Sequence, residues 1–273
     1  MTSPGPKPQT PACWGGPMQV LAAGLPLCAT STLKEIFEEA NFLNIGPTMH
    51  MNRCLSIPPN LRFILEALAE TDTQKRRAIL YKLFAGCAAT SGFPGHLFMK
   101  DLIEMYPDAK VVLNVHRPGA KDWALSMQSA VAPFLSWRHR IACFWSVPDR
   151  LHYLCEMEFQ HFVRDKFGVA NVWSEELYDK HNQWVLDICQ RKEKDVLVWE
   201  PSMGWGPLCR LLDQKEPEVE VPIIHDRDKM EMVVQRRIAI GLKLWTKKIA
   251  LPVGLCVLGG WGLSMVVSPW LAC

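Results

Sequence analysis

The amino-acid sequence predicts an α/β domain with a central, mostly parallel sheet. Short apolar runs, bounded by turn or polar residues, alternate with longer segments of helical periodicity. Such runs are typical of strands that are buried on both faces of a parallel sheet. A chain of 273 residues with 49% hydrophobic residues can bury the core of one large domain. Ligands of such domains bind beyond the carboxyl ends of the strands.

Four short apolar runs are expected to be strands, at residues 18–23, 85–89, 110–115 and 195–199. The last two of these runs are rich in β-branched residues. Helices are expected at residues 32–41, 59–69, 74–84, 96–106, 121–134, 149–167, 173–192 and 227–249. In the second helix, for example, Leu61, Ile64, Leu65 and Leu68 fall on one face.

The first strand leads into a loop that resembles a cradle for an anion. A tight turn is expected at Gly24, and Thr30, Ser31 and Thr32 stand where the next helix begins. A helix start presents free backbone N–H groups and the positive end of the helix dipole, so it favours a phosphate or sulfate. No Lys or Arg lies between Gly24 and Thr32, and Ala29 occupies a position where glycine is usual. The sequence therefore predicts the geometry of an anion site with weakened charge.

A second polar cluster follows the strand at 110–115. His116 and Arg117 come at the end of the strand, and Ser126 lies in the helix that follows Pro118. Arginine and a hydroxyl can hold a phosphate from two sides. Alternatively, Arg117 pairs with a surface carboxylate and Ser126 has no role in binding. The residues alone leave both interpretations open.

The strand at 195–199 continues into the cluster at 199–209. Two glycine-containing turns lead there into a short helix, and Trp205 and Leu208 are expected to pack in the core rather than to contact a ligand.

Composition argues against several classes of partner. The net charge is +2 and no basic stripe with interleaved aromatic residues is present, so nucleic-acid binding is not expected. The ten cysteines are scattered without CxxC or CxxxC pairs, which predicts buried, reduced thiols and no metal site. Candidate proton acceptors are His50, His96 and His116, each of which has a purely structural alternative.

The two ends of the chain differ from its middle. Residues 1–16 are rich in Pro, Gly, Ser and Thr, which predicts a disordered lead-in without a secretory signal, followed by a domain at 17–248.

Residues 249–273 carry no charge and follow several basic residues. As a helix they would span about 37 Å, against a hydrocarbon core of about 30 Å. This predicts an apolar C-terminal helix that anchors the protein in a membrane by a single pass, with the folded domain cytoplasmic. The alternative is an apolar helix that folds back over the domain.

Together the motifs resemble those of fungal sulfotransferase-like P-loop proteins, which are often labelled as NAD-dependent epimerase/dehydratase or P-loop NTPase-like proteins. The resemblance rests on the cradle and on residues 106–118, 198–209 and 222–226, and covers residues 18–226. It implies a P-loop three-layer sandwich and the donor 3′-phosphoadenylyl sulfate. The 5′-phosphosulfate would lie on Gly24, Thr30, Ser31 and Thr32, and the 3′-phosphate on Arg117 and Ser126.

The chain departs from the family pattern at several positions. Leu27 replaces an arginine and Ala29 a glycine of the cradle, while Gly92-Phe93-Pro94 stands where the family has Asp-x-Pro. The missing arginine removes charge-assisted hydrogen bonds of roughly 1.5–3 kcal/mol each. His50 matches a histidine of the family. The donor is therefore expected to be 3′-phosphoadenylyl sulfate or none.

These observations predict an enzyme that acts on a small hydroxylated molecule in fungal secondary metabolism. Two alternatives remain from the sequence. One is a cyclase, dehydratase or isomerase that uses the acceptor pocket without transferring sulfonate. The other is a catalytically silent, membrane-anchored accessory protein that organises the enzymes of a pathway.

Overall fold

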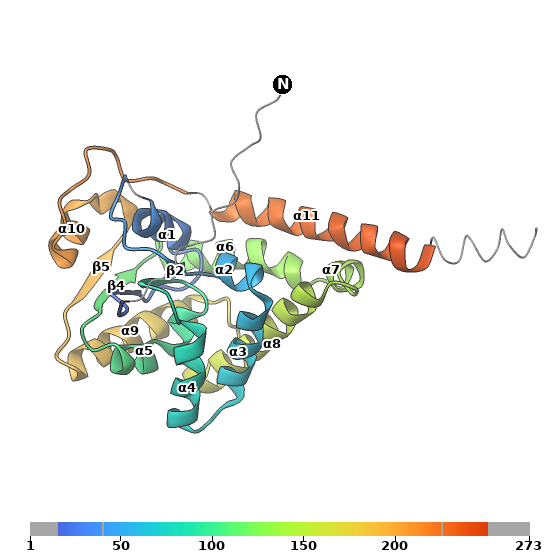
Figure 1. Cartoon of the computed structure of the whole chain (residues 1–273), viewed down its shortest axis with the longest axis horizontal. Coiled ribbons are helices and arrows are strands. Elements are labelled where there is room, and N and C mark those ends of the chain that lie inside the picture. The colour runs from blue at the N-terminus through green and yellow to red at the C-terminus, as the bar shows by residue number, and fades with distance from the viewer. Residues whose placement is uncertain (1–15, 40, 225, 251–273) are drawn as a thin grey trace, which may run out of the picture.

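The computed structural model describes residues 16–39, 41–224 and 226–250 and contains a central sheet of five parallel strands. The strand order is β2-β3-β1-β4-β5. Figure 1 labels β2, β4 and β5 among the surrounding helices. The strands are β1 (Val20–Ala22), β2 (Thr48–Met49), β3 (Ala89–Ser91), β4 (Lys110–Asn114) and β5 (Val196–Trp199). The predicted α/β class with a parallel sheet is confirmed.

Helices connect the strands. They are α1 (Thr30–Glu38), α2 (Met51–Ser56), α3 (Pro58–Ala69), α4 (Thr73–Leu83), α5 (Met99–Met105), α6 (Ala120–Leu135), α7 (Trp137–Ala142), α8 (Val147–Phe167), α9 (Glu175–Arg191), α10 (Gly206–Leu212) and α11 (Asp226–Trp245). Three shorter helical segments are η1 (Gly95–Phe98), η2 (Pro201–Met203) and η3 (Thr246–Ala250).

Most predicted elements are confirmed with shifted ends, and one strand was placed too early. The strand expected at 85–89 begins only at Ala89, because Gly86 has a φ of 73° and turns the chain before it. The helix expected at 96–106 consists of η1 followed by α5. The strand β2 and the helices α2 and α7 were not predicted.

The two faces of the sheet contribute to two separate hydrophobic clusters. Leu21 points into one cluster, whereas its neighbours Val20 and Ala22 point into the other. The first cluster includes residues of α3, α8 and α9, and the second includes residues of α1 and α10. Helices therefore cover both faces, and the expected three-layer sandwich is confirmed. Trp205 and Leu208 are buried in the second cluster, as predicted.

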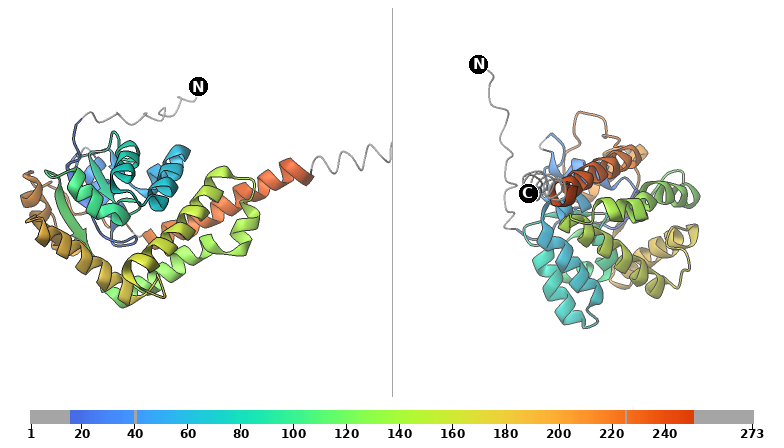
Figure 2. Two further views of the ribbon diagram at one scale, coloured as in Figure 1. Left: turned by 90° about the horizontal axis from the view of Figure 1, so that it is seen from below. Right: turned by 90° about the vertical axis from the view of Figure 1, so that its right-hand side faces the viewer.

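The helix α11 packs along α6 and α7 and reaches away from the sheet (Figure 2). It comes closest at Gly241, where a Cβ atom would lie only 2.1 Å from the carbonyl oxygen of Ala142. A larger side chain cannot be accommodated there unless the backbone moves.

The predicted single-pass membrane location is corrected by the structure. Within residues 16–39, 41–224 and 226–250, no helix combines the length and the apolar character that a membrane crossing requires. The last long helix that the structure describes, α11, carries Arg236, Arg237 and Lys243 and matches the helix expected at 227–249, not the apolar segment that follows it. Residues 251–273, which make up most of the predicted anchor, and residues 1–15 of the predicted lead-in lie outside the described residues.

Candidate functional site

The loop between β1 and α1, residues 23–29, is held by side chains from other elements. At the end of β4, Asn114 accepts a hydrogen bond from the N–H of Gly24 at 2.8 Å and donates one to the carbonyl of Cys28 at 2.6 Å. Gly24 is required because a Cβ atom would lie 2.0 Å from the backbone oxygen of Asn114. Trp123 donates to the carbonyl of Pro26 at 2.8 Å, and His181 Nε2 lies 2.9 Å from the carbonyl oxygen of Ala23.

Two residues of this loop have the left-handed backbone conformation that favours glycine. Leu27 has a φ of 64°, and Ala29, which precedes α1, has a φ of 55°. For residues with a side chain this conformation costs roughly 1–2 kcal/mol each. The contacts of Asn114, Trp123 and His181 hold the cradle in shape despite the two side chains.

The start of α1 leaves its first backbone N–H groups without a side-chain cap, since Ala29 has none to offer. Thr30 and Ser31 line a cavity, whereas Gly24 and Thr32 do not. The hydroxyl of Thr32 accepts a hydrogen bond from the backbone N–H of Ile224 at 3.1 Å. Of the three predicted hydroxyls, two therefore line the cavity and one ties α1 to the chain after α10.

The cavity has a volume of about 450 Å³ and is lined mainly by apolar side chains. These belong to the cradle loop, α2, the turn before η1, α6, α8 and α11, and they are Pro26, Leu27, Met51, Leu55, Phe93, Met127, Val131, Phe134, Phe159, Met230, Met232 and Val233. Its polar lining residues are Thr30, Ser31, His50, Asn52, His152, Glu156 and Arg236.

His50 is the one predicted histidine that lines the cavity. It caps the start of α2, where its Nδ1 accepts a hydrogen bond from the N–H of Asn52 at 3.3 Å. Burial, with a smaller effect of Lys34, lowers the pKa of His50 from 6.5 to about 4. The ring is therefore neutral at pH 7, and the bond to Nδ1 assigns its proton to Nε2.

Three further charged or titratable residues of the cavity were missed in the sequence. His152 Nε2 lies 3.6 Å from Glu156 Oε1 one turn later in α8, and both side chains are largely buried. Arg236 of α11 lines the same cavity and has no ion-pair partner in the described part of the chain. The spacing of His152, Glu156 and Phe159 places them on one face of the helix predicted at 149–167, which is the signal that could have identified the pair.

The other predicted histidines do not line the cavity. His96 is 2% exposed and packs against the rings of Phe93, Phe159 and His181. Burial lowers its pKa well below 6.5. His116 is partly buried after β4, where its backbone N–H donates to the hydroxyl of Tyr178 at 2.9 Å.

Arg117 lies at the same edge of the sheet as the cradle, because β1 and β4 are parallel neighbours. Its guanidinium is largely exposed and bonds to Glu200 Oε1 at 3.2 Å and to Ser202 Oγ at 2.7 Å. Arg117 thus pairs with a carboxylate, which was one of the two interpretations of the sequence. Neither Arg117 nor the half-buried Ser126 lines the cavity.

The residues of the cradle suit a phosphate or sulfate in shape more than in charge. The uncapped start of α1 presents N–H groups beside the hydroxyl of Ser31. Lys34, however, forms an ion pair with Glu38, and Leu27 supplies an apolar side chain. Among the described residues, Arg236 is the one Lys or Arg that lines the cavity.

Comparison with known proteins gives two matches. The profile of a family described as a sulfotransferase domain matches residues 19–230. The Ava biosynthesis cluster protein M of Aspergillus versicolor is 31% identical over 146 residues, which cover 50% of this chain and 53% of that protein. The chain thus matches about half the length of this curated relative.

Proposed function

Because the chain belongs to the sulfotransferase domain family, we propose that it is an enzyme that acts on a small, hydroxylated and largely apolar molecule in a fungal biosynthetic pathway. The pathway is inferred from the relative that is named as a biosynthesis cluster protein. The observation that carries the proposal is the cavity of about 450 Å³ in which the cradle, His50 and the His152–Glu156 pair meet.

The lining of the cavity fits this class of substrate. Small-molecule sites are mostly apolar, with a few polar groups that fix the orientation of the ligand. Most side chains that line this cavity are apolar, and its polar lining groups come from the cradle, from the start of α2, and from α8 and α11. A molecule with an apolar skeleton and one or more oxygen atoms satisfies both parts of this lining.

Two groups suit the chemistry of a substrate hydroxyl. With its proton on Nε2, His50 can donate a hydrogen bond to a substrate oxygen and stabilise the negative charge that develops there. The Glu156 carboxylate, paired with His152, can accept the proton that the hydroxyl loses. This division of roles differs from the sequence-based hypothesis, in which a histidine is the base.

Members of this family normally use 3′-phosphoadenylyl sulfate, which supplies the sulfonate group when it is bound. The backbone of the first turn of α1 and the hydroxyls of Thr30 and Ser31 would hold its phosphosulfate. Position 27 holds a leucine where the family has an arginine, whose charge-assisted hydrogen bonds would contribute roughly 1.5–3 kcal/mol each. Because these bonds are missing, the affinity for the donor is expected to be low.

A second candidate follows from the same two positions of the cradle. Leu27 and Ala29 remove charge and add side chains where the donor would approach, but they leave the apolar part of the cavity intact. They favour a conversion without sulfonate transfer, such as a cyclisation, dehydration or isomerisation, in which Glu156 moves a proton of the substrate.

Calorimetric titration of adenosine 3′,5′-bisphosphate into the full-length protein tests the cradle. The double variant Leu27→Arg/Ala29→Gly is expected to bind the nucleotide at least about tenfold more tightly than the wild type, because it restores a charged donor and relieves the strained backbone. Leu242→Arg adds the same charge at an exposed site on α11 and serves as the control.

The outcomes separate the candidates. Wild-type binding that weakens on Arg117→Ala supports sulfonate transfer, whereas binding by the double variant alone supports the conversion without sulfonate. If the double variant gains nothing over Leu242→Arg, the cradle is not an anion site.

A separate test concerns the proposed base. Glu156→Gln should abolish product formation in the producing host while the purified variant stays folded. An unchanged yield of product would refute the proposed role of Glu156 in the cavity.

A further inference from the structure

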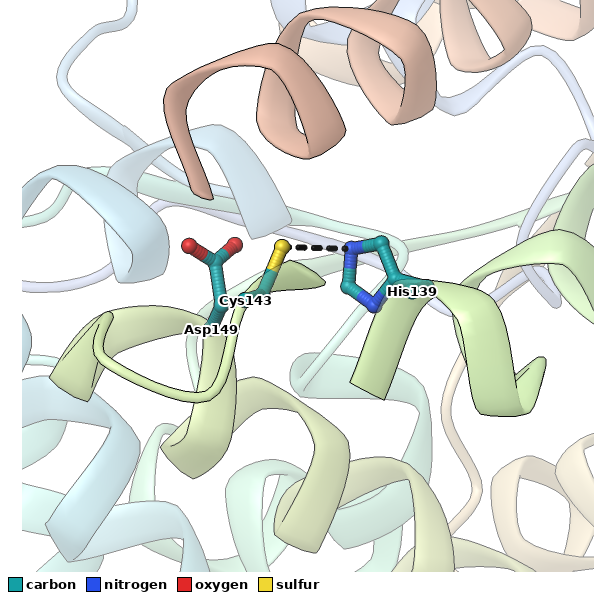
Figure 3. Close-up of side chains that lie close together, drawn as sticks. All are labelled: His139, Cys143 and Asp149. Carbon is teal, nitrogen blue, oxygen red and sulfur yellow. Dashed lines mark hydrogen bonds between the residues drawn. The ribbon is translucent and has the colours of Figure 1, made fainter. Parts of the chain in front are cut away.

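A second cluster of reactive side chains lies outside the cavity, where α7 turns into α8. We propose that His139, Cys143 and Asp149 form a zinc site at this turn. His139 belongs to α7, Cys143 follows the last residue of α7, and Asp149 lies in the first turn of α8 (Figure 3). The three residues are 2%, 3% and 4% exposed, so they are shielded from solvent.

The spacing of the donor atoms fits a tetrahedral ion. Zinc lies about 2.3 Å from sulfur and about 2.0 Å from nitrogen, which places two such ligands about 3.5 Å apart. His139 Nε2 and Cys143 Sγ are 3.5 Å apart, and Figure 3 shows them facing each other. One ligand atom from each of the three residues lies within 4.8 Å of the others. The carboxylate of Asp149 needs to move by only about 1 Å to complete the set.

The charge of Asp149 is a second, independent indication. A buried carboxylate is costly unless a cation or several hydrogen bonds balance it. Ser146 donates a hydrogen bond to Oδ2, and Arg237 forms a long ion pair with Oδ1, in which Nη1 lies 3.7 Å away and makes no hydrogen bond. Among the described residues Asp149 has no other ion-pair partner. A divalent cation between Asp149, Cys143 and His139 would neutralise the carboxylate directly.

The surroundings also orient the ligands. The ring of His139 packs edge-on against the ring of Phe134, with 5.5 Å between the ring centroids, and this contact helps to fix its orientation. Cys143 Sγ lies 3.5 Å from the carbonyl oxygen of Arg237, to which the thiol donates, so zinc would replace this weak bond. Nitrogen, sulfur and oxygen donors together favour zinc over the harder calcium and magnesium ions.

Such a site would act on the fold rather than on the substrate, since none of its three ligands lines the cavity. With a water molecule as the fourth ligand, zinc would join the end of α7 to the start of α8 beside α11. His152 and Glu156 follow in α8, so the ion would also stiffen one wall of the cavity.

Metal binding by the full-length protein tests this proposal. After treatment with a chelator, the protein is titrated with Co²⁺ and then with Zn²⁺ in competition with a chromophoric chelator. We expect one ion per chain, and a thiolate-to-cobalt absorption band in the near ultraviolet. The variants Cys143→Ser and His139→Ala should lose the band or bind zinc at least about 100-fold more weakly, since even outer partners of a metal site contribute 10–100-fold. Cys209→Ser removes another buried cysteine and should bind as the wild type does.

Failure of the wild type to take up one ion, or equal affinity of Cys143→Ser, would overturn the proposal. Because a buried variant can fail to fold, Asp149→Asn is measured as well, and circular dichroism confirms that each variant is folded. A folded Asp149→Asn chain that binds zinc as tightly as the wild type contradicts the three-ligand site. A rise in Tm on adding zinc is expected for the wild type and not for Cys143→Ser.

Discussion

At the scale of single residues, Asn114 contributes most to the shape of the cradle. Its amide bonds to backbone groups at both ends of the loop, Gly24 and Cys28, and it does so from the strand next to β1. The loop is therefore positioned by the fold itself before any ligand binds. This arrangement makes the cradle sensitive to a change at a residue that belongs neither to the loop nor to the cavity lining.

Replacement of Asn114 by alanine should lower the free energy of unfolding by about 2–4 kcal/mol. Both loop groups would lose this buried partner, and each such loss costs about 1–3 kcal/mol. Urea denaturation followed by circular dichroism measures the change. Gln190→Ala, at an exposed position of α9, should differ from the wild type by no more than about 0.5 kcal/mol. A loss below about 1 kcal/mol for Asn114→Ala would show that the loop does not depend on this side chain.

The cavity-lining residues of the cradle were easier to identify from the sequence than the other residues that line the cavity. Thr30 and Ser31 could be identified because a helix start after a strand is a local pattern. His152, Glu156 and Arg236 reach the cavity from helices more than 100 residues later in the chain, and nothing local marks them as partners of the cradle. The role of Thr32 was also hidden, since its partner is Ile224.

At the scale of elements, α11 forms one wall of the cavity and packs closely on the end of α7. Gly241 lets its backbone approach the carbonyl of Ala142, while Met230, Val233 and Arg236 line the cavity. The position of this helix therefore couples the α7 end of the domain to the cavity.

Replacement of Gly241 by alanine tests this coupling, because the two possible effects on the free energy of unfolding have opposite signs. Helix propensity alone predicts that alanine stabilises the protein by about 1 kcal/mol. The close approach to Ala142 predicts the opposite, a loss of about 1–3 kcal/mol, because the backbones must separate. Chemical denaturation decides between the two, and Lys243→Ala, at an exposed position of α11, is the control. A stabilised Gly241→Ala protein would mean that α11 is not held tightly against α7.

Element prediction failed where elements are short. The strand β2 has two residues and α2 and α7 have six each, too few for a period of two or 3.6 to be recognised. The membrane location was a different error. It was inferred from the length and the lack of charge of residues 249–273, whereas no helix in the described part of the chain could cross a membrane.

At the scale of the whole molecule, buried histidines link stability to pH. Desolvation lowers the pKa of both His50 and His181 from 6.5 to about 4. The unfolded chain therefore binds more protons than the folded chain between these values. The stability that the neutral rings contribute is present above about pH 6.5 and is lost as the pH falls towards 4.

We expect the free energy of unfolding to decrease by up to about 1.4 kcal/mol per pH unit for each of these histidines over that range. Denaturation curves at pH 7, 6, 5 and 4.5 measure the slope. His181→Gln should have a shallower slope than the wild type, whereas the exposed His161→Gln should match it. Equal slopes for His181→Gln and the wild type would show that His181 does not titrate in this way.

The class of fold was predictable because it depends on the order of strands and helices, and the family because its motifs lie in short continuous segments, residues 106–118, 198–209 and 222–226 among them. The alternation of buried runs with amphipathic segments is repeated along the chain, so small errors at element ends do not change the result. The composition of the cavity was not predictable, since its walls come from six separate parts of the chain.

The bond between Thr32 and Ile224 joins residues 192 positions apart and has a consequence for how the protein is made. Contacts between distant residues require the closure of long loops and form late during folding. A nascent chain that has not yet emerged beyond residue 224 lacks the partner of Thr32, although β1 and α1 were synthesised first. Helix α1 therefore acquires this tether only after residue 224 has been synthesised.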